Sequence, residues 1–418
     1  MSRLGRTLFV IFAATAVALV VGSTACTRRG GNGAPPVTTP TPISAYYVNP
    51  VKGNDANNGS SSAPFKTIGR ALKAVKSATT AAGLTISLSA GVYDAHSGEV
   101  FPIVVPTGVT ITGTSYGRAL TKGTYINGTG EDTTLEKSLG KPSSHTLYAT
   151  LVVPSGVSLT FDQIYIGTTI PPRSGTYSSV DVMGSMSASS DAFGIAGKGA
   201  ANGGIVVPSG TLSCIACYVI ARDFAIKAFS LSGSGSGPQV TLSGPGHSVI
   251  GGADGIRTDG TATITASTQV FQSRNNAYTD SLAAPTTAPS GKPSASPTGS
   301  SYYGGGSVDF GYGAQNSIGG NTFVGSATEI DVTLGDEQIV ARGNSWNVIA
   351  RGPQKTNRSG QYPRPLDFHP GADGMNVKIA GSAAGSEVSV GPPKPTPTPS
   401  PSPYYTGSPT ASPSASPT

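Results

Sequence analysis

The chain has 418 residues, enough for one large domain or two ordinary ones, and only 11% of them are charged, against roughly 25% in typical soluble domains. The 57 glycines and 33 prolines, with abundant Ser and Thr, indicate a surface hydrated by hydroxyls and amides. The net charge of +6 is spread thinly, without a run of Lys and Arg between aromatics. Nucleic acid is therefore not an expected partner.

The first 25 residues are predicted to be an export signal. Basic residues precede an apolar run at 8–21, which has the length expected for a leader. Cys26 follows Ala25, and a small residue before a cysteine resembles the bacterial lipoprotein signal, although Ser23 replaces the usual large aliphatic residue. We expect lipid on Cys26 and a membrane anchor on the extracytoplasmic side. Ordinary cleavage after Ala25, which would release a secreted protein, is the alternative.

Residues 46–113 pass from a short strand through a Gly/Asn/Asp loop into one amphipathic helix, and then into short strands punctuated by glycine. In the predicted helix, 67–82, Ile68, Leu72 and Val75 fall on one face. Such a helix can cover the open apolar end of a solenoid; packing beside a globular core is the alternative. This order resembles the opening of an uncharacterised bacterial family of right-handed parallel β-helices, related in fold to the pectate lyases. The resemblance implies an architecture and no particular activity.

The loop before this helix contains a candidate cation site. Asn54, Asp55 and Asn57 offer carboxylate and amide oxygens at close spacing, and calcium is the cation that prefers such ligands. Asn, Asp and Gly also form turns by bonding their own backbone. We therefore favour a turn without a metal, and calcium is the alternative.

Short stretches that alternate apolar and polar residues recur further along, as half-buried strands should. They are residues 109–112, 158–161, 211–214, 240–242, 262–264 and 307–310. The phrase VPTG or VPSG recurs at Val105, Val153 and Val207. Repeated strand-plus-turn units are typical of a solenoid. We predict an all-β, single-stranded right-handed parallel β-helix with an N-terminal capping helix and no other helix. A β-sandwich is the alternative, and it is disfavoured because Asn-Gly hairpin turns are scarce.

The two cysteines of the TLSCIACYVI segment are predicted to point inward. Alignment with SLTFDQIYI places Cys214 opposite Phe161 and Cys217 opposite Ile164. In an exported protein this arrangement favours a short-range disulfide or two buried thiols. A redox pair would need an electropositive setting, and zinc would need further ligands.

A lyase of the pectate type would need carboxylates to hold calcium and a basic residue to take a proton. Such residues occur in two segments: Arg222, Asp223 and Lys227 in IARDFAIK, and Asp254, Arg257 and Asp259 in GGADGIRTDG. In the second segment, the two aspartates would hold calcium and the arginine would take the proton. A solvated, salt-bridged turn uses the same residues, and we favour that interpretation.

Two further Pro-rich stretches follow. Residues 392–418 are predicted to be a disordered tail, as 26–44 are predicted to be a flexible linker. Residues 285–300 are interpreted as a disordered loop inside one β-helix domain spanning 45–391, because the strand pattern is similar on both sides. A hinge between two domains is the alternative.

The sequence leaves three functions open for an exported surface protein. The first is non-catalytic binding of a polysaccharide or another envelope component along a solenoid face. The second is a polysaccharide lyase or hydrolase, and the third is a structural or adhesive spacer. Calcium is the only cofactor indicated. An uncharged face lined by Tyr, Asn and Thr would favour binding, whereas exposed carboxylates beside a basic residue would favour an enzyme.

Overall fold

The computed structural model describes residues 44–77, 83–106, 108–114, 123–139, 146–169, 175–196, 201–231, 237–244, 249–280, 307–311, 314–319, 321–324, 328–332, 338–342, 344–350, 368–369, 377–379 and 387–391. All of them belong to one compact unit, residues 43–418. The signal segment with Cys26, the stretch 285–300 and the tail 392–418 lie outside the described residues, so their interpretation stays a prediction.

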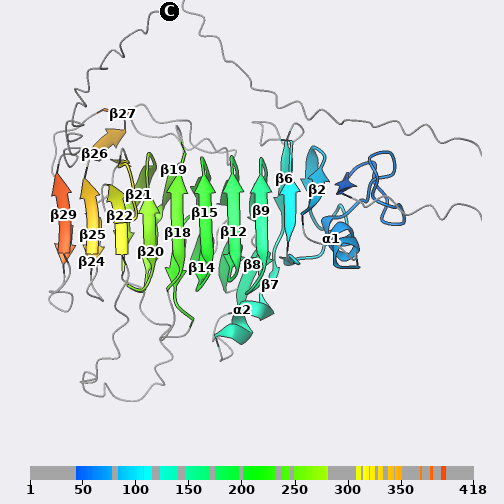
Figure 1. Ribbon diagram of the computed structural model, residues 1–418, viewed down its shortest axis with the longest axis horizontal. Coiled ribbons are helices and arrows are strands. Elements are labelled where there is room, and N and C mark those ends of the chain that lie inside the picture. Colours follow the sequence, from blue (N-terminus) through cyan, green and yellow to red (C-terminus); the bar gives the residue numbers. More distant parts are fainter. Residues whose placement is uncertain are drawn as a thin grey trace, which may run out of the picture. The chain divides into compact units, whose positions relative to one another are not determined.

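One sheet contains 11 described strands, and all its neighbouring strands are parallel. Figure 1 shows most of these strands side by side, one from each coil of the chain. In spatial order they are β1 (Ala45–Val48), β2 (Leu84–Leu88), β5 (Val109–Thr112), β9 (Ser158–Asp162), β12 (Ser185–Ser189), β15 (Thr211–Ile215), β18 (Gln239–Ser243), β20 (Thr263–Ala266), β22 (Ser307–Gly311), β25 (Gln338–Arg342) and β29 (Glu387–Gly391). All six strands predicted from apolar–polar alternation lie in this sheet.

The other sheet contains 18 described strands, which are parallel except at the pairings β7–β8 and β26–β27. They are β3 (Gly91–Tyr93), β4 (Ile103–Val104), β6 (Thr124–Asn127), β7 (Gly130–Glu131), β8 (Leu147–Val153), β10 (Tyr165–Thr169), β11 (Thr176–Val182), β13 (Ala192–Ala196), β14 (Ala201–Pro208), β16 (Tyr218–Ile220), β17 (Phe224–Phe229), β19 (Val249–Thr258), β21 (Val270–Thr279), β23 (Thr322–Val324), β24 (Thr328–Val332), β26 (Ser345–Ala350), β27 (Phe368–His369) and β28 (Val377–Ile379). Each coil contributes strands to both sheets, and equivalent strands of successive coils pair in parallel, which confirms the predicted parallel β-helix.

The core lies between the sheets and is built from columns of in-register side chains. In one column Phe161 of β9 lies next to Ala188 of β12, which lies next to Cys214 of β15. All three are buried, and the small alanine beside the large phenylalanine keeps the column filled without overpacking. Each fully buried aliphatic or aromatic side chain of this kind contributes roughly 1.5–3 kcal/mol of hydrophobic free energy.

The predicted N-terminal helix is confirmed as α1, Ile68–Ser77, which lies at the β1 end of the stack (Figure 1). Its buried residues, which include Ile68, Leu72 and Val75, belong to the same apolar cluster as the first strands. Residues 78–82, the predicted last turn, lie outside the described part. Two carboxylates hold its N-terminus: Asp55 accepts the Thr67 N–H at 2.9 Å, and Glu99 accepts the Ile68 N–H at 2.5 Å.

The expectation of a single helix is wrong, because a second, short helix is present. It is α2, Thr133–Ser138, on the outer side of the 18-stranded sheet beside β8. Asp132 caps it, and Leu135 is its buried residue. Periodicity could not reveal a helix of six residues with a single buried position. In the described part of the chain, neither helix has the length and apolar character needed to cross a membrane.

The segment that contains 285–300 is flanked by strands of both sheets. Before it lie β20 and β21, and after it lie β22, β23 and β24. β20 pairs directly with β22, and β21 pairs with both β23 and β24, all in parallel. The strands on either side therefore belong to the same two sheets.

Candidate functional site

Two of the charged residues singled out from the sequence lie in a strand, not in a turn. Asp254 and Arg257 both belong to β19 of the 18-stranded sheet. Asp254 is in register with Phe224 of β17 and Asn276 of β21, and a register shift next to Asp254 marks a bulge. Bulges re-aim side chains out of the regular pleat. Here the bulge lies next to Asp254, whose carboxylate contacts both Arg257 and Asn276.

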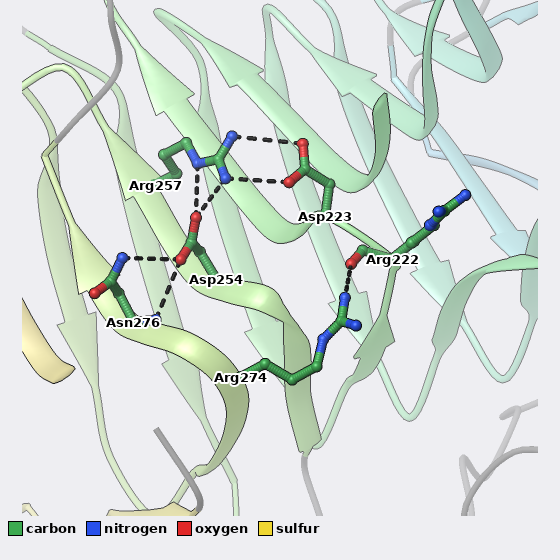
Figure 2. Close-up of polar contacts among 6 residues, drawn as sticks. All are labelled: Arg222, Asp223, Asp254, Arg257, Arg274 and Asn276. Carbon is green, nitrogen blue, oxygen red and sulfur yellow. Dashed lines mark hydrogen bonds and ion pairs between the residues drawn. The ribbon is translucent and has the colours of Figure 1, made fainter. Parts of the chain in front are cut away.

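Arg257 is held by two carboxylates on the outer side of this sheet (Figure 2). Its Nε donates to Asp254 Oδ2 at 3.0 Å, and its Nη2 makes a shorter contact with the same oxygen. Nη2 also donates to Asp223 Oδ1 at 3.2 Å, and Nη1 reaches Asp223 Oδ2 at 3.5 Å. Asp223 directly precedes β17, so this carboxylate reaches Arg257 from the preceding coil.

Asp254 has both oxygens engaged. While Oδ2 accepts from Arg257, Oδ1 accepts the backbone N–H of Asn276 at 3.2 Å and its side-chain Nδ2 at 3.0 Å. The residue is only 4% exposed. A buried charge is stable only when it is paired and hydrogen-bonded, and these bonds meet that condition for Asp254. They also leave few free lone pairs on its oxygens with which to bind a calcium ion.

The same contacts oppose a role for Arg257 as a base. Burial lowers the pKa of Arg257, but the hydrogen bonds that it donates to Asp254 and the charge of Asp223 outweigh burial and raise the pKa above its ordinary value. A guanidinium held in this way stays protonated and cannot take a proton from a substrate. The arrangement is suited to structural stabilisation and not to β-elimination.

Asp259 does not join this cluster, in contrast to the sequence-based grouping. Its Oδ1 accepts the N–H of Thr261 at 3.1 Å and the Thr261 hydroxyl at 2.6 Å, while Oδ2 accepts the Ser230 N–H at 2.8 Å. Asp259 thus ties the corner after β19 to the corner after β17. The second carboxylate beside Arg257 is Asp223, from the first candidate segment, and not Asp259 as predicted.

Lys227 and Arg222 from the first segment are separate from the ion pairs. Lys227 is in register with Arg257 and is half-buried, with its Nζ 5.3 Å from the centre of the Phe229 ring. Burial and the nearby charge of Arg257 lower the pKa of Lys227. Arg222 points away from the ion pairs in Figure 2, and its backbone carbonyl accepts from Arg274 Nη2 at 2.9 Å.

The candidate cation ligands near the N-terminus serve turns and the helix cap. Asn54 Oδ1 accepts the Ala56 N–H at 3.0 Å, and Asn57 Nδ2 donates to a backbone carbonyl. Asp55 accepts the N–H groups of Lys66 and Thr67 at 2.8 and 2.9 Å. No group of three or more His, Cys, Asp and Glu able to hold a metal occurs among the residues that the structure describes.

Cys214 and Cys217 are free and buried, on either side of a tight corner. Cys214 faces the core from β15, and Cys217 Sγ lies 3.8 Å from the carbonyl oxygen of Ala188. Burial raises the pKa of the Cys217 thiol, and the neighbouring Cys214 adds to this effect. A thiol with a raised pKa is a poor nucleophile and metal ligand.

A second candidate surface, which sequence reasoning did not identify, covers the outer face of the 11-stranded sheet. Its middle column carries a hydroxyl on seven consecutive strands, and we name this column the hydroxyl ladder. It consists of Thr85, Thr110, Thr160, Ser187, Ser213, Thr241 and Thr265. None of these hydroxyls bonds to another residue within the described part of the chain. All seven are exposed or half-buried, so their hydrogen-bonding capacity faces solvent.

The columns on either side of the hydroxyl ladder are also nearly uncharged. From β9 to β18, the outward positions beside the ladder carry a single carboxylate, Asp162, and no Lys or Arg. Ile215 is an exposed apolar residue among them, at 43% exposure. Neighbouring strands lie about 4.8 Å apart, so the ladder presents hydroxyls at a regular spacing along the solenoid. In the sequence, the ladder is indicated by the polar residues of the strands that alternate apolar and polar positions.

Comparison with known proteins leaves the activity of this chain open. The family described as a protein of unknown function (DUF1565) matches residues 51–172, less than half of the chain. Two crystal structures of the GH136 lacto-N-biosidase from Eubacterium ramulus, a selenomethionine derivative and the native protein, are similar at 11% and 10% identity, with TM-scores of 0.28 and 0.27. Each alignment covers 72% of this chain but 61% and 65% of the biosidase chains, less than two thirds of their length. No curated protein matches the chain.

Proposed function

We propose that this chain is an exported, lipid-anchored β-helix protein that binds polysaccharide through the hydroxyl ladder without cleaving it. The observation that carries the proposal is the ladder itself: seven in-register hydroxyls with no hydrogen-bonding partner among the described residues. Sugars are recognised largely by hydrogen bonds to their hydroxyls. A surface that presents donors and acceptors at regular spacing can bind successive units of an extended glycan.

The charge distribution favours neutral glycans over acidic ones. Binding of a carboxylated or sulfated polymer draws on Arg and Lys, whose charge and geometry suit such anions. From β9 to β18 the outward positions of this face contain neither residue and contain one carboxylate, Asp162. Attachment through Cys26 would hold this face at the cell surface, where envelope or environmental glycans are available.

Retention and cleavage on a panel of neutral and acidic polysaccharides test the proposal together. We expect the protein to be retained by at least one neutral polysaccharide, and to release neither new reducing ends nor unsaturated products, with calcium supplied. Heat-unfolded protein serves as the control for non-specific adsorption. Absence of retention on every polymer would contradict the binding function.

The alternative function, a polysaccharide lyase, makes the opposite prediction in the same assay. Unsaturated product from a uronic-acid polymer, abolished by Arg257→Ala, would replace the binding proposal with that enzyme. The contacts of Arg257 and Asp254 oppose this outcome, because the first is held protonated and the second has both oxygens engaged.

The anchor has a separate test. Cys26→Ser protein should leave the membrane fraction while keeping its retention on polysaccharide, because the modified cysteine and the ladder lie in different parts of the chain. Cys26→Ser protein that stays in the membrane fraction at the wild-type level would contradict lipid attachment at this residue.

A further inference from the structure

The short helix α2 covers an apolar patch on the outer side of the 18-stranded sheet. Leu135 of the helix forms a second apolar cluster, separate from the core, with buried residues of four coils. The cluster contains Ala149, Val152, Met183, Val206 and Phe224 besides Leu135. A six-residue helix is far too short to be stable by itself. Its position therefore depends on this cluster and on whatever fixes its N-terminus.

Asp132 fixes that N-terminus with one of its two oxygens. Oδ1 accepts the N–H groups of Thr134 at 2.9 Å and Leu135 at 3.0 Å. The residue is completely buried, and its second oxygen, Oδ2, receives no hydrogen bond from any N–H or hydroxyl of the described residues. A buried carboxylate oxygen without a donor is costly, so another group must supply a proton to it.

Asp181 of β11 is in position to supply that proton. Its carboxyl lies within hydrogen-bonding reach of the Asp132 carboxyl and is 2% exposed. The Ser178 hydroxyl donates to Asp181 Oδ1 at 2.5 Å, so the other oxygen of Asp181 is available for the contact with Asp132. Two carboxylates this close and this deeply buried cannot both be ionised. A proton on Asp181 donated to Asp132 Oδ2 satisfies both residues.

The charged groups around the pair do not remove the need for this proton. Burial and the neighbouring Asp132 raise the pKa of Asp181 well above its ordinary value, while Ser178 and Lys227 lower it by less. Lys227 lies two strands away in register and makes no ion pair within 4.0 Å in the described part of the chain. Glu136, the acidic residue of α2, is directed elsewhere and accepts the Leu147 N–H at 2.9 Å.

We propose that the proton shared by Asp132 and Asp181 is a latch that keeps α2 on the sheet, and that loss of this proton at higher pH releases the helix. In the closed form the carboxyl pair joins the N-terminus of α2 to β11. Without the proton, two like charges repel each other at that junction. Opening would expose Leu135 and its partners on the sheet, an apolar patch that is covered in the closed form.

The direction of the pH dependence follows from linkage. The closed form has the higher Asp181 pKa, so it binds more protons than the open form, in which Asp181 has an ordinary pKa. The open fraction therefore increases as the pH rises from the ordinary pKa towards the raised one. The increase is up to about tenfold per pH unit and levels off once the closed pair itself ionises.

Two methionines allow opening to be measured without perturbing the latch. Met183 is 5% exposed and lies beneath α2, with the Ser138 hydroxyl 3.7 Å from its Sδ. Met186 is 2% exposed but faces the core of the solenoid from β12. Oxidation of each by dilute peroxide, followed by peptide mass spectrometry from about pH 5 to about pH 9, reports α2 opening at Met183 and global unfolding at Met186.

We expect Met183 oxidation to rise severalfold with pH in the wild-type protein while Met186 stays protected. Asp181→Asn places a neutral donor in the same position and should make Met183 oxidation independent of pH. Asp191→Asn, which removes a buried carboxyl between β12 and β13, should keep the wild-type pH dependence. Wild-type Met183 oxidation that does not change with pH, or that changes equally in Asp181→Asn, would overturn the latch.

Discussion

The outer face of the 11-stranded sheet and the outer face of the 18-stranded sheet around Arg257 both carry many polar groups, but they use them differently. Around Arg257, the oxygens of Asp254 and Asp223 bind the guanidinium, and Asn276 occupies the remaining oxygen of Asp254. On the hydroxyl ladder, no hydroxyl has a partner among the described residues. Charged residues thus hold neighbouring coils together around Arg257, whereas the uncharged hydroxyls of the ladder form the surface that we propose as a binding site.

The largest effect predicted from this comparison is on stability, at Arg257. Arg257→Ala would leave Asp254, which is 4% exposed, as a buried charge without its cation. We expect a loss of about 3–5 kcal/mol in the free energy of unfolding, measured by chemical denaturation. Arg274→Ala is the matched control, because Arg274 is exposed and donates to one backbone carbonyl; its cost should be within about 0.5 kcal/mol. Equal effects of the two substitutions would show that the ion pairs are not structural.

A smaller effect is expected from pH, through two other buried carboxyls. Burial raises the pKa of Glu99 and that of Asp191 to about 7 each. Both values are higher than in the unfolded chain, so the folded state binds more protons between about pH 4.5 and 7 and loses stability as the pH rises. Each carboxyl can contribute roughly 3–4 kcal/mol, since one pKa unit is worth about 1.4 kcal/mol.

The melting temperature should accordingly be several degrees higher at about pH 5 than at about pH 8. Asp191→Asn and Glu99→Gln should each reduce this difference, because an amide does not titrate. A melting temperature that rises over the same interval would refute the assignment of these two groups.

The sequence predicted the 11-stranded sheet well because its signal is local. Alternation within four or five residues identifies a strand and its buried face, and it correctly predicts that Phe161 and Cys214 share one inward column. Successive strands carry different side chains, but the six strands predicted from this signal all alternate apolar and polar residues with a period of two. The helical cap α1 was predicted for the same reason, since its apolar face repeats within ten residues.

The candidate site was harder to predict because it depends on register between coils. Asp223 and Arg257 are 34 residues apart, and their contact depends on how each coil turns its corners. Asp259 is two residues from Arg257 but points to Ser230 and Thr261. Nearness in the sequence therefore selected the wrong carboxylate. The hydroxyl ladder was missed for a different reason. A single Ser or Thr at an outward strand position is common, and only the alignment of seven strands shows that these hydroxyls form one column.

The most direct test of the account removes hydroxyls from the ladder and keeps its shape. Thr110, Thr160 and Thr241 lie on three strands of the ladder, and Val has nearly the same shape and suits a strand. The triple change to Val should cost little stability but reduce retention on the neutral polysaccharide that binds the wild-type protein by at least about tenfold, or about 1.4 kcal/mol. Thr133→Val, at an exposed position of α2, is the control and should bind normally. Unchanged retention of the folded triple variant would contradict binding through the ladder.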